Sequence, residues 1–163
     1  MKHNVMGLDL SLTASAYHDG ADCCGLIKTK FLGAERLQHI SNCIFHIVEL
    51  ESPQLVVVED YAYGARGHAF SIGELGGLIK LGLFERGFRV LLVTPTSLKK
   101  FVTNKGNSPK DIMMLQTFKK YGVEFTDNNL CDAYGLAQVG KAYLGGTEVK
   151  YEKEVLKKTI VYC

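Results

Sequence analysis

Apolar residues along the chain form short runs and helical stripes, a pattern that predicts an α/β fold. In the first run the positions alternate, so Met6 and Leu8 would face one side of a sheet while Val5 and Gly7 face the other. Short connections between the first runs are typical of an antiparallel meander. The three strands expected in this meander are residues 5–10, 14–17 and 26–31.

Helices and buried strands alternate after the meander. Two continuous aliphatic runs indicate strands buried on both faces of the sheet, at residues 55–58 and 90–93. Apolar residues at helical spacing predict helices at residues 34–50, 68–85, 96–102, 109–121 and 129–143. This order predicts a mixed five-stranded sheet, an antiparallel meander followed by a β-α-β unit, with helices on both faces.

The length of 163 residues suits one domain with its own hydrophobic core. We expect residues 1–146 to form that domain and residues 147–163 to be its C-terminal extension, folded either as a further helix or as an edge strand. No apolar run approaches the ~20 residues of a membrane helix, and the start has no signal-peptide pattern. Five cysteines without a CxxC motif indicate free thiols. A cytoplasmic protein without membrane contact is therefore expected.

Three acidic residues occupy positions where an acid is energetically costly. Asp9 interrupts the first strand, Glu59 follows the most hydrophobic strand, and Asp132 lies near the start of the last helix. Each has a structural alternative, such as capping a turn or complementing a helix dipole. Together at a strand edge they would suit hard cations such as Mg²⁺ or Mn²⁺, and two such ions are the usual apparatus of phosphodiester hydrolysis.

Amide and acidic neighbours extend this group. Asn128 and Asn129 precede Asp132 by a helical turn, and each offers a neutral carbonyl oxygen as a weaker ligand. Asp127 is a further acid whose simplest role is to cap the helix.

These motifs together resemble a known family. The strings are GLDLSLT from Gly7, VVVE ending at Glu59, PTSLKK from Pro95, and DNNLCDA from Asp127. They are similar to the RuvC-like Holliday junction resolvases of the short kind found in bacteriophages. The resemblance spans most of the chain, and the order and spacing of the motifs carry it.

The resemblance implies an RNase H-like fold, a homodimer, and metal-dependent nicking of opposed strands in a four-way DNA junction, in the cytoplasm of a bacterial host. By position, Asp9, Glu59 and Asp132 match the metal-binding acids. The family usually has a further Asp where this chain has Asn129, which bears on whether two ions bind. Asp127 as a metal ligand, or a water held by Asn128 or Asn129, is the expected compensation. An engineered Asp→Asn change at Asn128 or Asn129 would give the same sequence.

The net charge of +2 conceals a local basic stretch. Four lysines and no acid lie between Thr94 and Lys110, and this stretch is either a solvated face or a phosphate-binding element on a flexible loop. The family places an aromatic residue after this strand, so the resemblance implies that a tyrosine following Glu59 stacks on a base at the DNA junction. The alternative is that the tyrosines pack against the edge of the sheet. The residues expected to contact DNA are Lys99, Lys100, Lys105, Lys110, Arg66, Tyr61 and Tyr63.

Glycines in the helix at residues 68–85 require a reason, because each costs up to ~1 kcal/mol there. Gly73, Gly76 and Gly77 are expected at a homodimer interface, and tight packing inside the monomer is the alternative.

Two other functions stay open. One is a branched-DNA-binding protein of the same fold with little or no catalysis. The other is an actin-like or sugar-kinase-type phosphate-binding domain, although such enzymes need two domains and this chain holds one.

Overall fold

The computed structural model describes residues 4–60 and 69–162. Its centre is one mixed sheet of six strands in the order β3-β2-β1-β4-β5-β6. The first three strands form an antiparallel meander, β4 and β5 run parallel to β1, and β6 is antiparallel to β5. The strands are β1 Val5–Asp9, β2 Ala14–His18, β3 Cys24–Lys28, β4 Leu55–Glu59, β5 Val90–Val93 and β6 Ile160–Tyr162.

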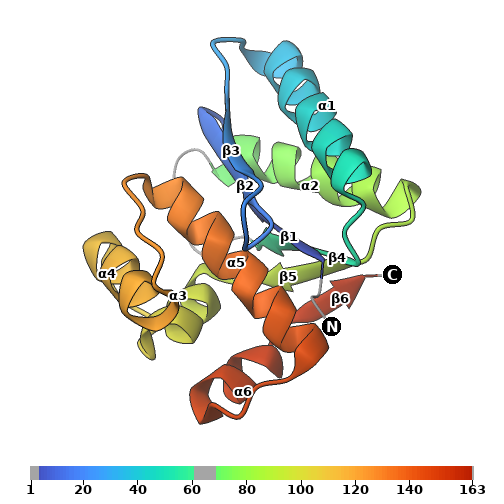
Figure 1. Cartoon of the computed structure of the whole chain (residues 1–163). Coiled ribbons are helices and arrows are strands. Elements are labelled where there is room, and N and C mark those ends of the chain that lie inside the picture. Colours follow the sequence, from blue (N-terminus) through green and yellow to red (C-terminus); the bar gives the residue numbers. More distant parts are fainter. Residues whose placement is uncertain (1–3, 61–68, 163) are drawn as a thin grey trace.

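Helices cover both faces of this sheet, as the sequence pattern predicts (Figure 1). One face packs on α1 and α2, and the other packs on α5 together with α3, α4 and α6. Met6 and Leu8 enter the first core and Val5 the second, which confirms the predicted alternation. The helices are α1 Gly33–Glu51, α2 Ala69–Glu85, α3 Pro95–Thr103, α4 Lys110–Tyr121, α5 Asn128–Gly145 and α6 Lys150–Leu156. None of the described helices is long and apolar enough to cross a membrane.

The expected count of five strands is wrong by one, because the C-terminal segment contains both a helix and a strand. β6 pairs with β5 through register partners that include Val161 and Leu91. The buried carboxylate of Glu152 holds α6 in place through an ion pair with the Lys120 ammonium of α4, at 2.6 Å. A three-residue strand is too short to show a period, so the sequence could not distinguish the two alternatives.

The position of α5 depends on two glycines. A Cβ on Gly7 of β1 would collide with the Ala133 carbonyl and lie 2.6 Å from the Ala137 nitrogen, both of α5. A Cβ on Gly140 would lie 2.5 Å from Val5 and 2.6 Å from Val57. At Gly7 the strand therefore lies directly against the backbone of α5, and at Gly140 the helix packs closely on the side chains of Val5 and Val57.

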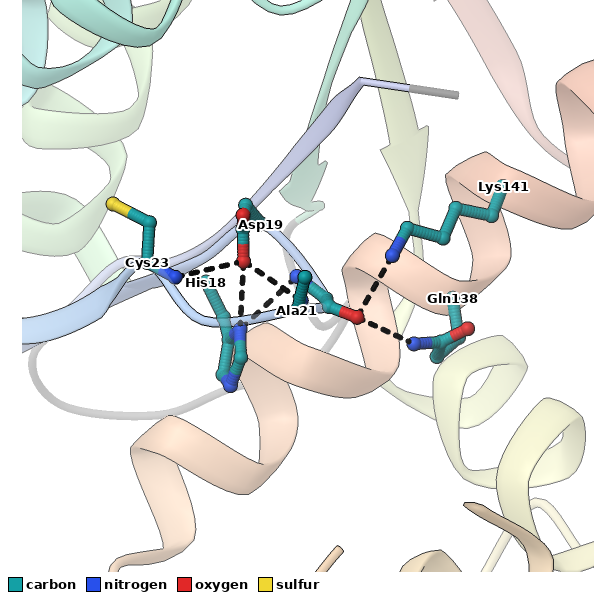
Figure 2. A network of polar contacts seen from close by, with 7 residues as sticks. His18, Asp19, Ala21, Cys23, Gln138 and Lys141 are labelled. Atoms are coloured by element: carbon teal, nitrogen blue, oxygen red, sulfur yellow. Dashed lines mark hydrogen bonds and ion pairs between the residues drawn. The ribbon is translucent and has the colours of Figure 1, made fainter. Parts of the chain in front are cut away.

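A polar network fixes the β2–β3 turn to α5 (Figure 2). The Asp19 carboxylate accepts hydrogen bonds from the backbone N–H groups of Ala21 and Cys23. The Gly20 carbonyl accepts from Lys141 Nζ at 2.8 Å and from the Gln138 side chain at 3.4 Å. The hairpin is thereby anchored to the helix that carries Asp132.

Candidate active site

Asp9 and Glu59 lie side by side at the carboxyl ends of neighbouring parallel strands. Leu8 and Val58 are register partners, so the acids that follow them emerge from the same sheet edge. This edge is where open α/β sheets place their sites. α5 passes over β1, and its second turn brings Asp132 to the same place.

These three acids share a pocket of about 310 Å³. It is lined by Asp9, Leu10, Ser11, Glu59, Pro95, Leu98, Lys99, Lys110, Asn129 and Asp132. Ser11, in the turn after β1, was not predicted as a site residue, and its closeness to Asp9 in the sequence is the signal that could have found it. The pocket therefore combines three carboxylates, one amide and two ammonium groups.

Burial and mutual repulsion raise the pKa of the acids. The pKa of Asp9 is raised to about 8, mainly by burial and then by the charges of Glu59 and Asp132. The pKa of Glu59 is raised to about 7 by burial and by Asp132, while Lys99 and Lys110 oppose the shift. Burial also raises the pKa of Asp132, against the same two lysines. Burial and mutual repulsion therefore oppose full ionisation of the three acids, even with the two lysines beside them.

The described residues include no group of three or more His, Cys, Asp or Glu side chains close enough to enclose a single ion. The three acids instead surround one pocket and interact through their charges. Their donors, with the Asn129 amide, are all oxygen or amide groups, and oxygen ligands suit hard cations such as Mg²⁺. The donor chemistry therefore fits a divalent cation, whose charge would offset the cost of burying these acids.

The three residues before Leu130 have different roles. Asp127 caps α5, accepting the N–H groups of Asn129 at 2.8 Å and Leu130 at 3.1 Å, which confirms its predicted capping role. Asn129 lines the pocket and donates its side-chain N–H to the Ala14 carbonyl at 3.1 Å. Asn128 is not among the described pocket-lining residues, and its Oδ1 is buried without a hydrogen-bond partner in the described part of the chain.

The predicted DNA-contacting lysines divide into two groups. Lys99 of α3 and Lys110 of α4 line the pocket. Lys100 points to the C-terminal segment, where its Nζ pairs with Glu154 at 2.7 Å. Pairing with Glu154 makes Lys100 a structural link between α3 and α6 rather than a free cation.

Lys105 lies exposed in the turn between α3 and α4. Instead of the flexible loop expected there, hydrogen bonds close this turn. Thr103 Oγ1 contacts the Lys99 carbonyl, the Lys105 backbone and the Ser108 hydroxyl. Lys105 is thus presented on a preformed turn.

Two further groups of predicted residues have different outcomes. Tyr61, Tyr63 and Arg66 lie outside the described residues. On α2, an added Cβ on Gly73 or Gly77 would meet no atom of the described residues within 4 Å.

Packing inside the chain accounts for the other two α2 glycines. Gly76 is buried within the chain, so it does not lie on the open face of the helix as the interface prediction requires. A Cβ on Gly82 would collide with the Phe45 ring of α1.

Comparison with known sequences identifies crossover junction endodeoxyribonucleases as relatives of this chain. The sequence family described as crossover junction endodeoxyribonuclease RuvC matches residues 20–139, a range that contains Glu59 and Asp132 and begins after Asp9. The RuvC of Carboxydothermus hydrogenoformans is 29% identical over 115 residues, covering 69% of this chain and 73% of the relative. The RuvC of Hydrogenovibrio crunogenus is 24% identical over 137 residues, covering 82% and 79%.

Solved structures share the fold. The Thermus thermophilus RuvC structure has a TM-score of 0.71 at 21% identity, covering 88% of this chain and 96% of that one. The same protein in complex with Holliday junction substrate has a TM-score of 0.70 at 22% identity, covering 87% and 96%. The yeast mitochondrial Holliday junction resolvase Ydc2 has a TM-score of 0.59 at 15% identity, covering 96% and 81%.

Proposed function

Because the chain belongs to the crossover junction endodeoxyribonuclease RuvC family, and is thus a junction-resolving nuclease, we propose that Asp9, Glu59 and Asp132 carry its chemistry. The observation that carries this proposal is the convergence of these acids in one pocket, with the pKa values of Asp9 and Glu59 near 8 and 7. The family assignment also decides against an actin-like or sugar-kinase-type domain.

RuvC-family nucleases depend on divalent metal ions. We propose Mg²⁺ or Mn²⁺ here, two ions per site, held by the three carboxylates with the Asn129 amide. A metal held by these residues would supply an activated water and would stabilise charge on the leaving 3′ oxygen. Asp9 and Glu59, on rigid strand ends, hold the site on the sheet, while Asp132 closes it from α5.

The lysines around the pocket suit the phosphate that is cut. We propose that Lys99 and Lys110 attract and orient the scissile phosphate, since both line the pocket. Lys105, on its closed turn, would contact a phosphate further along the strand. Tyr61 or Tyr63 stacking at the junction crossover and Arg66 contacting a phosphate stay predictions from the sequence.

A symmetric junction requires two cuts, and we propose that a homodimer makes them through the outer face of α2. This face is apolar and exposed at Phe70, Leu81 and Phe84, with Gly73 and Gly77 allowing close approach. Beside it, a hollow of about 270 Å³ lies between α2 and the β5–β6 edge. We place the enzyme in the cytoplasm of a bacterial host, where its DNA substrate would lie.

A junction-cleavage assay tests the proposal. Purified protein is incubated with Mg²⁺ and a synthetic four-way junction, or with a linear duplex of matched sequence. We expect paired nicks in opposed strands of the junction only, and Asp9→Asn and Glu59→Gln should abolish cutting while junction binding is retained. Near wild-type cutting by either variant would show that the site is misassigned, and binding without cutting by the wild type would favour the non-catalytic alternative.

A further inference from the structure

Asn129 makes a contact that an ionised aspartate could not make. Its side chain lies 3.1 Å from the carbonyl oxygen of Ala14, the first residue of β2. A carbonyl oxygen only accepts hydrogen bonds, so the amide nitrogen must face it. The orientation of the amide is thereby fixed, with Oδ1 as the atom directed away from Ala14.

Asn129 is also held through its backbone. Its N–H donates to the Asp127 carboxylate at 2.8 Å, in the cap of α5. The residue therefore joins the first turn of α5 to the start of β2, and it lines the same pocket as Asp9, Glu59 and Asp132. An aspartate here would bring a carboxylate oxygen against the Ala14 carbonyl and a further negative charge into a pocket with three acids.

We propose that Asn129 is a positioning residue and neutral metal ligand: its amide nitrogen holds α5 against β2, and its Oδ1 completes a cation site that bears three negative charges. This inference rests on the proposed function, because it takes the pocket to be the metal site. A ligand without charge weakens cation affinity relative to a carboxylate, since affinity for hard cations depends on the charge of the ligands.

Metal binding, measured without DNA, tests this role. Mn²⁺ is titrated into the full-length protein at pH 8 by isothermal calorimetry, and folding of every variant is checked by circular dichroism. Asn129→Ala should weaken Mn²⁺ binding about tenfold. Asn128→Ala, which changes the neighbouring amide outside the described pocket lining, should leave binding unchanged.

Asn129→Asp separates the ligand role from a purely structural one. It keeps an oxygen donor but loses the bond to Ala14, so Mn²⁺ binding at pH 8 should be at least as tight as in the wild type. The metal-free variant should melt at a lower temperature than the wild type at pH 8. If Asn129→Asp weakens Mn²⁺ binding as much as Asn129→Ala, then Oδ1 is not a ligand and the inference is overturned.

Asp9→Asn distinguishes failure of this inference from failure of the proposed function. If Asp9→Asn leaves Mn²⁺ binding intact, the pocket is not the metal site and both proposals fall. If Asp9→Asn abolishes binding while Asn129→Ala does not change it, only the role of Asn129 is overturned.

Discussion

Gly7 of β1 lies directly against the backbone of α5 at Ala133, the residue that follows Asp132. The absence of a side chain at Gly7 thus sets how near Asp132 comes to Asp9, two residues further along β1. One glycine in a strand thereby determines the geometry of the candidate catalytic pocket.

Gly7→Ala should destabilise the protein and impair cleavage. The added methyl group meets backbone atoms of α5, including the Ala137 nitrogen at 2.6 Å, so the helix must move and carry Asp132 with it. We expect a loss of about 1–3 kcal/mol in the free energy of unfolding, measured by urea denaturation. At a temperature where the variant stays folded, junction cleavage should still be lowered at least tenfold.

Gly140→Ala is the matched control for this effect. Its methyl group would meet the side chains of Val5 and Val57 at the other end of the same helix contact. It should cost comparable stability while preserving most of the cleavage rate under folded conditions. Equal losses of cleavage in both variants would show that Gly7 has no special bearing on the pocket.

Metal-free protein should lose stability as the pH rises from about 4 to 8. The pKa of Asp9 is raised from 3.8 to about 8 and that of Glu59 from 4.5 to about 7, so the native state binds more protons than the unfolded state in this window. Ionisation on raising the pH then favours unfolding. Melting curves in EDTA between pH 5 and pH 9 measure this slope.

Asp9→Asn should remove much of that slope. The substitution deletes a buried charge and removes its repulsion of Glu59. The free energy of unfolding of the metal-free variant at pH 8 should therefore exceed that of the wild type by on the order of 2 kcal/mol. At pH 5 this difference should be much smaller, because most of the window between the unfolded-state and native-state pKa values of Asp9 lies above pH 5. An unchanged slope would contradict the cause assigned to the raised pKa of Asp9.

Much of this architecture can be predicted from the sequence, for reasons that differ between elements. The succession of strands along the chain before residue 94 follows from their patterns. Val5–Leu8 places alternate residues on opposite faces of the sheet, and Leu55–Val58 is apolar over its full length. The C-terminal segment could not be predicted. Its attachment depends on long-range pairs such as Lys120 with Glu152, which no local pattern indicates.

The candidate site shows the same division. Asp9, Glu59 and Asp132 stand out because an acid in apolar sequence is costly, and the structure places all three in one pocket. By contrast, neighbouring Lys99 and Lys100 look equivalent in sequence. Only the packing of α6 on α3 shows that one lines the pocket while the other pairs with Glu154.

This difference between the lysines can be measured through salt dependence. Lys99→Gln and Lys110→Gln should each weaken junction binding and lower the slope of log K against log salt by about 0.9, because each would remove one phosphate contact. Fluorescence anisotropy in EDTA between 50 and 200 mM NaCl gives the slope. Lys100→Gln is the control and should leave it unchanged, whereas an equal decrease would place Lys100 on the DNA.

The outer face of α2 gives the last prediction. Leu81 is 56% exposed on this face beside Phe84, and it lines the hollow next to β6. If a second copy covers it, the wild type should sediment as a dimer at micromolar concentration. Leu81→Glu should then sediment as a folded monomer, because dimerisation would bury an unpaired charge.

Leu115→Glu is the control, since Leu115 is an exposed leucine on α4, away from α2. It should leave the dimer intact. The Leu81→Glu monomer should nick the two opposed strands of a junction in separate binding events, so singly nicked junctions should accumulate. If the wild-type protein sediments as a monomer at tens of micromolar, the homodimer proposal is wrong. Two coordinated cuts then could not come from a preformed pair of active sites.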